Sequence, residues 1–272
     1  MNISSKVRLN NGRKMPVLGL GVYQIRPNQA KQVFQWAIDM GYRLFDTASL
    51  YGNEKEVGQA ILKSTVTRSE FFITSKLWNT DQGYNNALSA FENSMDQFGL
   101  DYIDLYLIHW PVTNLRLESW TALESLVETE RVKAVGVSNY MINHLEELLQ
   151  KCSVIPVINQ VEFHPWLYKK ALLKYCEENR IQLQAYSPLT KGQKLGDKKL
   201  KKIGDKYGKS PSQILIRWCL QHNVPTIPKS ANKQHLEQNI NVFDFHLTQK
   251  DMMKLDLMNQ DYSVTWDPRD YP

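Results

Sequence analysis

The sequence predicts a closed (β/α)8 barrel, an α/β fold of the TIM-barrel type, with an N-terminal β-hairpin and a single domain over residues 1–272. Short apolar runs alternate with longer helical patterns, which is typical of a parallel sheet covered by helices. The length of 272 residues suits eight such units. No change in composition marks a linker, so we expect one barrel domain.

The first elements are a hairpin, a strand and a helix. We predict the hairpin over 7–15, because Asn11 and Gly12 suit a two-residue turn. A buried strand over 17–21 follows. The apolar pattern then predicts an amphipathic helix over 28–41 that ends at Gly41.

The remaining elements continue the alternation. Ser210 as N-cap and Pro211 in the first turn mark one helix start clearly. Further strands are predicted at 42–47, 70–78, 101–111, 132–139, 154–163, 181–189 and 224–230. Further helices are predicted at 54–64, 85–99, 117–130, 141–151, 168–180, 210–222, 232–239 and 247–258.

An open doubly wound sheet is the alternative fold. It would normally place a G-x-G-x-x-G turn after the first strand. The related string here, GLGVYQ from Gly19, lacks the third glycine and leads into no immediate helix. The sequence therefore favours the closed barrel.

Composition and charge narrow the classes of partner. No apolar run is long enough to span a membrane, and the N-terminus has no secretory signal pattern. The three scattered cysteines indicate structural thiols in a reducing compartment, so we expect a cytoplasmic protein without a metal site. The net charge is +5, and its densest lysine cluster spans 191–209. Without an aromatic stacking platform, this cluster favours a solvated helix face or attraction of an anionic cofactor over nucleic-acid binding.

Polar side chains follow three neighbouring predicted strands. Asp46 and His109 stand directly behind apolar residues, and Lys76 closes the run FFITSK. Barrel enzymes carry their catalytic groups at the C-terminal ends of strands, and adjacent strand ends meet at one rim. A single histidine of this kind would more often be structural. Three ionisable groups on consecutive strands instead predict an active site.

Tyr51 lies in the loop just after Asp46. A free phenol is a poor acid at neutral pH. A nearby ammonium such as Lys76 would lower the pKa of Tyr51, and Asp46 would hold that ammonium in place. We therefore predict a tuned proton donor, with His109 binding a substrate carbonyl.

The order and spacing of seven motifs resemble the aldo-keto reductases over nearly the whole chain. The motifs are FDTASLYGNE, TSKLW, LIHWP, GVSN, NQVEFHP, AYSPL and IPKS. The short segment after AYSPL is similar to that of the shorter microbial and protozoan members. The resemblance implies NADPH-dependent reduction of aldehydes and ketones by a monomer, with Tyr51 as general acid, tuned by Lys76 and Asp46, and His109 orienting the carbonyl.

The resemblance also implies a cofactor site. Its residues are Gly21, Val22, Tyr23, Asp46, Ser138, Asn139, Gln160, Tyr186, Ser187, Pro188, Leu189, Lys229, Ser230, His235, Gln238 and Asn239. The family usually has Arg at His235 and often Glu at Gln238. An imidazole is only partly charged at neutral pH, whereas Arg offers a permanent bidentate cation. We expect NADPH to be preferred by a reduced margin, with NADH as a possible second cofactor.

The predicted substrate site is an aromatic rim of Tyr23, Trp78 and Trp110 beside His109. Such a rim suits aldehydes and apolar or aromatic ketones. Trp266 either helps to close the pocket or is a surface anchor, and Glu162 near the rim has no assigned role.

Two other functions compete with the reductase. A barrel that binds the cofactor as a regulatory subunit is disfavoured by the four intact site residues. A metal-assisted hydrolase lacks clustered ligands at the strand ends. The sequence leaves the physiological carbonyl substrate and the oligomeric state open.

Overall fold

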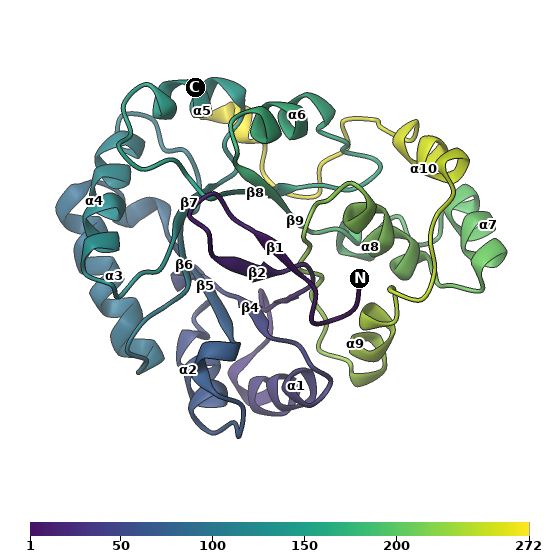
Figure 1. The fold of residues 1–272 in the computed structure, drawn as a ribbon, viewed down its shortest axis with the longest axis horizontal. Coiled ribbons are helices and arrows are strands. Elements are labelled where there is room, and N and C mark those ends of the chain that lie inside the picture. Colours follow the sequence, from purple (N-terminus) through teal and green to yellow (C-terminus); the bar gives the residue numbers. More distant parts are fainter. Residues whose placement is uncertain (272) are drawn as a thin grey trace.

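The computed structural model describes residues 1–271 and has the predicted barrel. Parallel strands lie side by side in chain order, with helices around them (Figure 1). The strands are β3 (Leu20–Gly21), β4 (Leu44–Asp46), β5 (Phe72–Leu77), β6 (Leu105–Ile108), β7 (Val135–Ser138), β8 (Ile158–Glu162) and β9 (Gln182–Tyr186).

The predicted strand at 224–230 is reduced to isolated bridges. Thr226 pairs in parallel with Leu18 on one side and Ala185 on the other. Two prolines in this segment lack a backbone N–H and cannot donate to a ladder. The segment therefore closes the barrel between its first and last strands, but as a seam with few hydrogen bonds.

The helices follow the predicted alternation with small shifts at their ends. They are α1 (Pro27–Asp39), α2 (Glu54–Leu62), α3 (Tyr84–Phe98), α4 (Arg116–Glu128), α5 (Ile142–Leu149), α6 (Lys170–Glu178), α7 (Lys198–Tyr207), α8 (Pro211–Gln221), α9 (Lys233–Ile240) and α10 (Gln249–Asp256). Ser210 caps α8 in a reciprocal pair with Gln213, as its sequence indicates.

Helix α7 accounts for the lysine cluster. Asp197 caps its first turn by accepting from two backbone N–H groups. Leu200 and Ile203 are buried, in a helix that packs against α8, and the lysines at 198, 199, 201 and 202 are exposed. The lysines of α7 therefore form the solvated face of an amphipathic helix, while Lys191 of the same cluster lines the cavity described below.

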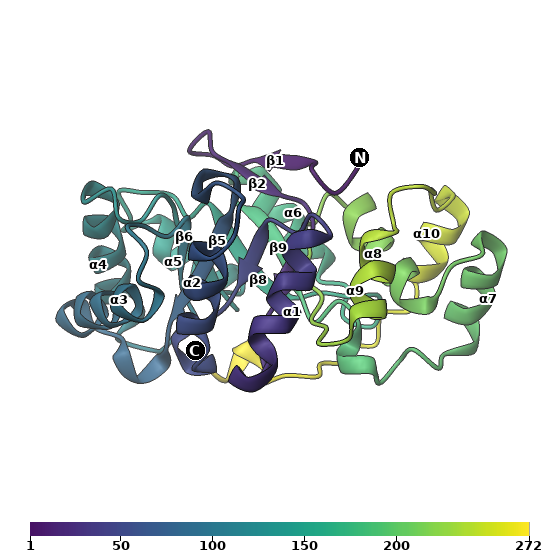
Figure 2. The same ribbon diagram turned by 90° about the horizontal axis from the view of Figure 1, so that it is seen from below.

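The hairpin closes one end of the barrel. Strands β1 (Lys6–Arg8) and β2 (Lys14–Pro16) pair in antiparallel fashion. Leu9 and Met15 pack into the same buried cluster as barrel residues such as Leu107. Figure 2 shows the hairpin at one end of the barrel and the C-terminal tail at the other. The end that carries the strand C-termini is thus left for a site. Among residues 1–271, no helix is long and apolar enough to cross a bilayer.

Candidate active site

The ends of β4 and β5 place a buried ion pair at the base of the site. Asp46 is the last residue of β4, and Lys76 is the fifth residue of β5. The Lys76 ammonium donates to the Asp46 carboxylate, and also to the carbonyl oxygen of Thr47 at 2.8 Å. The two charged side chains are 1% and 2% exposed. The strand register therefore brings together two of the predicted residues.

Burial shifts the pKa values of both partners towards their neutral forms. It raises the pKa of Asp46, although the attraction of Lys76 and a hydrogen bond from Gln160 at 2.6 Å oppose the shift. It lowers the pKa of Lys76, against the attraction of Asp46. The pair is thus held in a site where charge is costly.

Tyr51 lies above this pair at the end of a short 3-10 turn, Ser49–Tyr51. Its ring centre is 5.8 Å from that of His109 and 5.2 Å from the Lys76 Nζ atom. Burial and the negative charge of Asp46 raise the pKa of Tyr51 well above its ordinary value of 10. The sequence led us to expect the opposite direction, because desolvation is not visible in a pattern of residues. The phenol therefore keeps its proton at neutral pH.

His109 follows β6 and faces the same space. Its side chain packs edge-on against Trp78, with ring centres 5.1 Å apart. Burial, together with the positive charge of Lys76, lowers the pKa of His109 well below 6.5. A neutral imidazole carries one N–H group, so His109 can donate a single hydrogen bond to a substrate oxygen.

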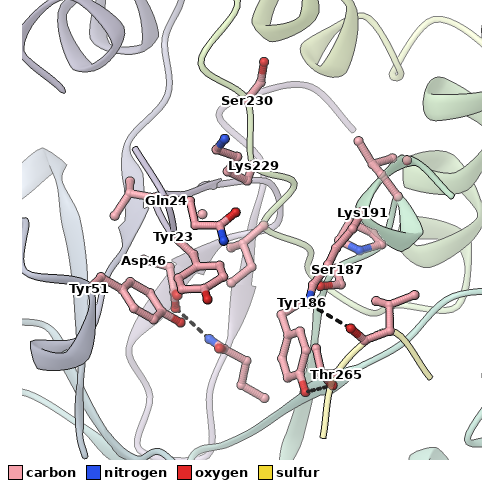
Figure 3. A pocket seen from close by; sticks show the side chains of 18 of the residues that line it. Tyr23, Gln24, Asp46, Tyr51, Tyr186, Ser187, Lys191, Lys229, Ser230 and Thr265 are labelled. Atoms are coloured by element: carbon pink, nitrogen blue, oxygen red, sulfur yellow. Dashed lines mark hydrogen bonds between the residues drawn. The ribbon is translucent and has the colours of Figure 1, made fainter. Parts of the chain in front are cut away.

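These residues border one cavity of about 840 Å³. Figure 3 shows Tyr51, Asp46 and Tyr23 on one side of it, with Tyr186 and Thr265 across. All of the predicted cofactor and substrate residues line it. Lys76 lies behind Asp46. Lining residues that the sequence did not indicate are Gln24, Leu50, Lys191, Gly192, Leu195, Ser210, Ser212, Ile227, Val264 and Thr265.

A hydrogen-bond network fixes the strand ends on the far wall of the cavity. The Tyr186 hydroxyl donates to Asn139 Oδ1 at 2.7 Å. The Asn139 amide donates to the His109 carbonyl oxygen at 2.9 Å, and Ser138 donates to the Gln160 carbonyl oxygen at 2.8 Å. The network presents a tyrosine ring, two amides and a hydroxyl around one space.

The other end of the cavity suits an anionic nucleotide. Lys229 and His235 are exposed there, beside the nearly buried Ser230. The Nδ2 atom of Asn239 is buried and has no hydrogen-bond partner among the described residues, so it is free to bind a ligand. At Gly21, a Cβ atom would stand 2.7 Å from a backbone carbonyl oxygen of the seam, so only glycine fits.

The chain resembles known reductases over nearly its whole length. Residues 17–260 match the model of the Aldo/keto reductase family. The chain is 47% identical to the glyoxal reductase of Bacillus subtilis, covering 98% of this chain and 97% of that protein. It is 45% identical to the 9,11-endoperoxide prostaglandin H2 reductase of Trypanosoma cruzi, over 97% and 95% of the two chains. These findings confirm the resemblance drawn from the motifs.

A solved structure supports the fold. The aldo-keto reductase of Bombyx mori in complex with NADP superposes with a TM-score of 0.91 at 34% identity. The match covers 98% of this chain and 97% of that one. It confirms the predicted barrel with its hairpin.

Proposed function

Since the chain belongs to the aldo/keto reductase family, we propose that it reduces aldehydes and ketones to alcohols with NADPH. The observation that carries this proposal is the single cavity that joins the Tyr51, Asp46 and His109 side chains to the nucleotide-suited end. The whole chain, residues 1–272, would act as one domain. When bound, the reduced nicotinamide supplies a hydride for the carbonyl carbon.

Tyr51 is the proposed proton donor. Its raised pKa keeps the hydroxyl protonated at neutral pH. Negative charge develops on the substrate oxygen as the carbonyl is reduced, and a proton from the Tyr51 hydroxyl neutralises it. The Lys76 ammonium near the ring would then favour the phenolate that remains.

His109 is the proposed orienting group. Its neutral ring offers one N–H to the carbonyl oxygen, and its packing against Trp78 fixes the direction of that bond. A fixed donor near the reacting oxygen aids the reaction because no group must reorganise. Trp78 and Trp110 supply an apolar wall for the remainder of the substrate.

The cofactor would lie between Tyr186 and the cationic end. Ser138, Asn139 and Gln160 offer amide and hydroxyl groups to a carboxamide, and the Tyr186 ring offers a stacking surface. Lys229, Ser230 and His235 would hold the phosphate of the adenosine, and Asn239 the base. The unpaired Asn239 amide supports this fit.

The proposed preference for NADPH over NADH is moderate. His235 is exposed at the end of the cavity where a 2′-phosphate would lie, and its imidazole lacks the planar bidentate fork that an arginine would offer there. We expect His235→Arg to raise the ratio of kcat/KM for NADPH to that for NADH. A ratio above about a thousandfold in the unmodified protein, roughly 4 kcal/mol, would contradict a weakened site.

The protein is proposed to be a monomer and to lie in the cytoplasm. The described residues contain free thiols and no disulfide, which suits a reducing compartment.

The test is turnover by a Tyr51→Phe variant. With NADPH and either benzaldehyde or methylglyoxal, oxidation of the cofactor is followed by absorbance. Loss of the proton donor should lower kcat/KM by at least about a hundredfold, whereas NADPH affinity, measured by fluorescence, should persist. Tyr84→Phe is the matched control, because Tyr84 lies at the start of α3 away from the cavity. Tight NADPH binding without turnover of any carbonyl would instead indicate a cofactor-binding regulatory protein.

A further inference from the structure

One buried carboxylate holds the C-terminal tail, residues 259–271, across the site end of the barrel (Figure 2). Glu162, the last residue of β8, is 2% exposed. Its Oε1 atom accepts a hydrogen bond from the backbone N–H of Val264 at 2.7 Å. Its Oε2 atom accepts from the hydroxyls of Ser263 at 2.8 Å and Thr265 at 2.5 Å. A single side chain thus binds three consecutive residues of the tail.

The barrel fixes this carboxylate from behind. The Nε2 atom of His164, a fully buried residue, lies 2.8 Å from Glu162 Oε1. Burial raises the pKa of Glu162, but the hydrogen bonds from His164 and from the tail outweigh it and lower the pKa to about 2. Glu162 is therefore charged at neutral pH, and hydrogen bonds to a charged acceptor are stronger than those to a neutral one.

The last turn of the tail is anchored separately. His144 Nδ1 accepts from the backbone N–H of Met141 at 3.0 Å, so Nε2 is the protonated nitrogen and donates to the Tyr271 carbonyl oxygen at 2.5 Å. The Asn79 amide donates to the Tyr271 hydroxyl at 3.2 Å. Between Glu162 and these contacts of Tyr271, the tail crosses the cavity at Trp266.

Trp266 lies in this part of the tail, directly after the residues that Glu162 binds. Its ring centre is 6.1 Å from that of Trp78 and 5.6 Å from that of Trp110. Trp266 is 59% exposed, so packing against the barrel does not by itself fix its position. The tail therefore adds a third indole to the wall formed by the two barrel tryptophans.

The same stretch contacts the cofactor side of the cavity. The Thr265 hydroxyl lies 3.0 Å from the Tyr186 hydroxyl, and Lys191 Nζ donates to the Val264 carbonyl oxygen at 2.8 Å. Figure 3 shows Tyr186, Lys191 and Thr265 converging at this wall. Displacing the tail would thus remove contacts from both halves of the cavity.

We propose that Glu162 is a positioning residue that holds the tail so that Trp266 forms the outer wall of the substrate pocket and selects flat aromatic carbonyl compounds. The proposal rests on the reductase function. An indole can stack on an aromatic ring and gains little from a small aliphatic carbonyl. The Glu162 carboxylate does not touch the substrate; it acts through Ser263, Val264 and Thr265.

The test compares two substrates in Glu162→Gln. A glutamine keeps one oxygen acceptor and brings an NH2 group against the hydroxyl and N–H donors of the tail. We expect KM for benzaldehyde to rise about tenfold, and to rise at least about fivefold more than KM for methylglyoxal. Trp266→Ala should show the same selective loss. The double variant should be no worse than either single variant, because both remove one wall.

Asp251→Asn is the matched control. Asp251 is also a buried carboxylate with several donors, including Tyr207 and Thr248, but it lies on α10 and does not line the cavity. Its replacement should leave the ratio of the two KM values unchanged. Equal losses for both substrates in Glu162→Gln, or no change in KM for benzaldehyde, would overturn the proposal.

A second measurement separates this proposal from the reductase function. Hydrogen exchange of the Val264 amide should become faster in Glu162→Gln, because that N–H loses its carboxylate acceptor. If the unmodified protein reduced no carbonyl compound, the proposed function would fail. Unchanged Val264 exchange in the variant would instead show that Glu162 does not hold the tail.

Discussion

Asp46 and Glu162 are two buried carboxylates at strand ends of the same rim, each 2% exposed, and the barrel stabilises them in opposite ways. Asp46 faces one ammonium, that of Lys76, which is desolvated as well, and its pKa is raised. Glu162 accepts several hydrogen bonds from neutral groups and one from an imidazole, and its pKa is lowered. At Asp46 desolvation outweighs Lys76 and the hydrogen bond from Gln160, whereas at Glu162 the hydrogen bonds outweigh desolvation.

The difference matches the proposed roles. The desolvated pair of Asp46 and Lys76 is sensitive to any change of charge beside it, which suits a site where a phenol must lose a proton. A carboxylate that stays ionised throughout the neutral range suits a permanent anchor.

The largest expected effect follows from breaking the ion pair. Lys76→Met leaves the Asp46 carboxylate buried without its counter-ion, and should lower the free energy of unfolding by about 3–5 kcal/mol. Urea denaturation measures this. Asp46→Asn combined with Lys76→Met should recover most of the loss. Lys174→Met, which breaks an exposed pair with Glu178, is the control and should change little. If Lys76→Met were as stable as the unmodified protein, water would have to reach the Asp46 carboxylate, and the pair would not be desolvated.

The next effect concerns Glu162, which holds the tail. Glu162→Gln should lower the free energy of unfolding by about 1–2 kcal/mol, less than Lys76→Met, because glutamine keeps one oxygen acceptor and leaves no full charge buried without a counter-ion. The same urea titration measures it. A loss as large as that of Lys76→Met would show that the barrel itself depends on Glu162, and the contrast would fail.

Acid should weaken the anchor over a defined range. The pKa of Glu162 is lowered from 4.5 to about 2 on folding, so its contribution is fully present above about pH 4.5 and is lost as the pH falls towards 2. The unmodified protein should therefore lose stability in this range by an amount that Glu162→Gln does not lose. Parallel stability curves for the two proteins between pH 5 and about 2.5 would contradict the lowered pKa.

The smallest expected effect is on the pH dependence of kcat/KM near neutral pH. Because burial lowers the pKa of His109 well below 6.5, the ring is already neutral there. The profile of kcat/KM for carbonyl reduction should show no inflection due to His109 near pH 6.5. Comparison with His109→Gln, which keeps a donor and does not titrate, checks this. An inflection that disappears in the variant would show that His109 is charged in the resting site.

The contrast also marks what the sequence could predict. Asp46, Lys76 and His109 follow regular strands, so strand periodicity alone placed them at one rim. The tail has no periodic pattern, and its position depends on side-chain contacts such as that of Thr265 with Glu162. Glu162 was therefore near the rim without a role, and Val264 and Thr265 were not expected in the cavity.

Two further differences have the same origin. The strand predicted at 224–230 is reduced to a bridge because its prolines remove donors, although its apolar residues are typical of a strand. The direction of the Tyr51 pKa depends on how far the ring is desolvated, which only the packed structure shows. Patterns of residues predict elements well, and predict burial of individual polar groups poorly.

The seam at Thr226 bears on how the barrel folds. Thr226 pairs with Leu18, near the start of the chain, and with Ala185 at the end of the sheet. Contacts between such distant segments form slowly, because a long loop must close before any of its hydrogen bonds can offset the lost entropy. The sheet from β3 to β9 consists of neighbours in sequence and can assemble step by step. Closure of the cylinder at Thr226 therefore carries a larger loop-closure entropy than the pairing of any two neighbouring strands from β3 to β9.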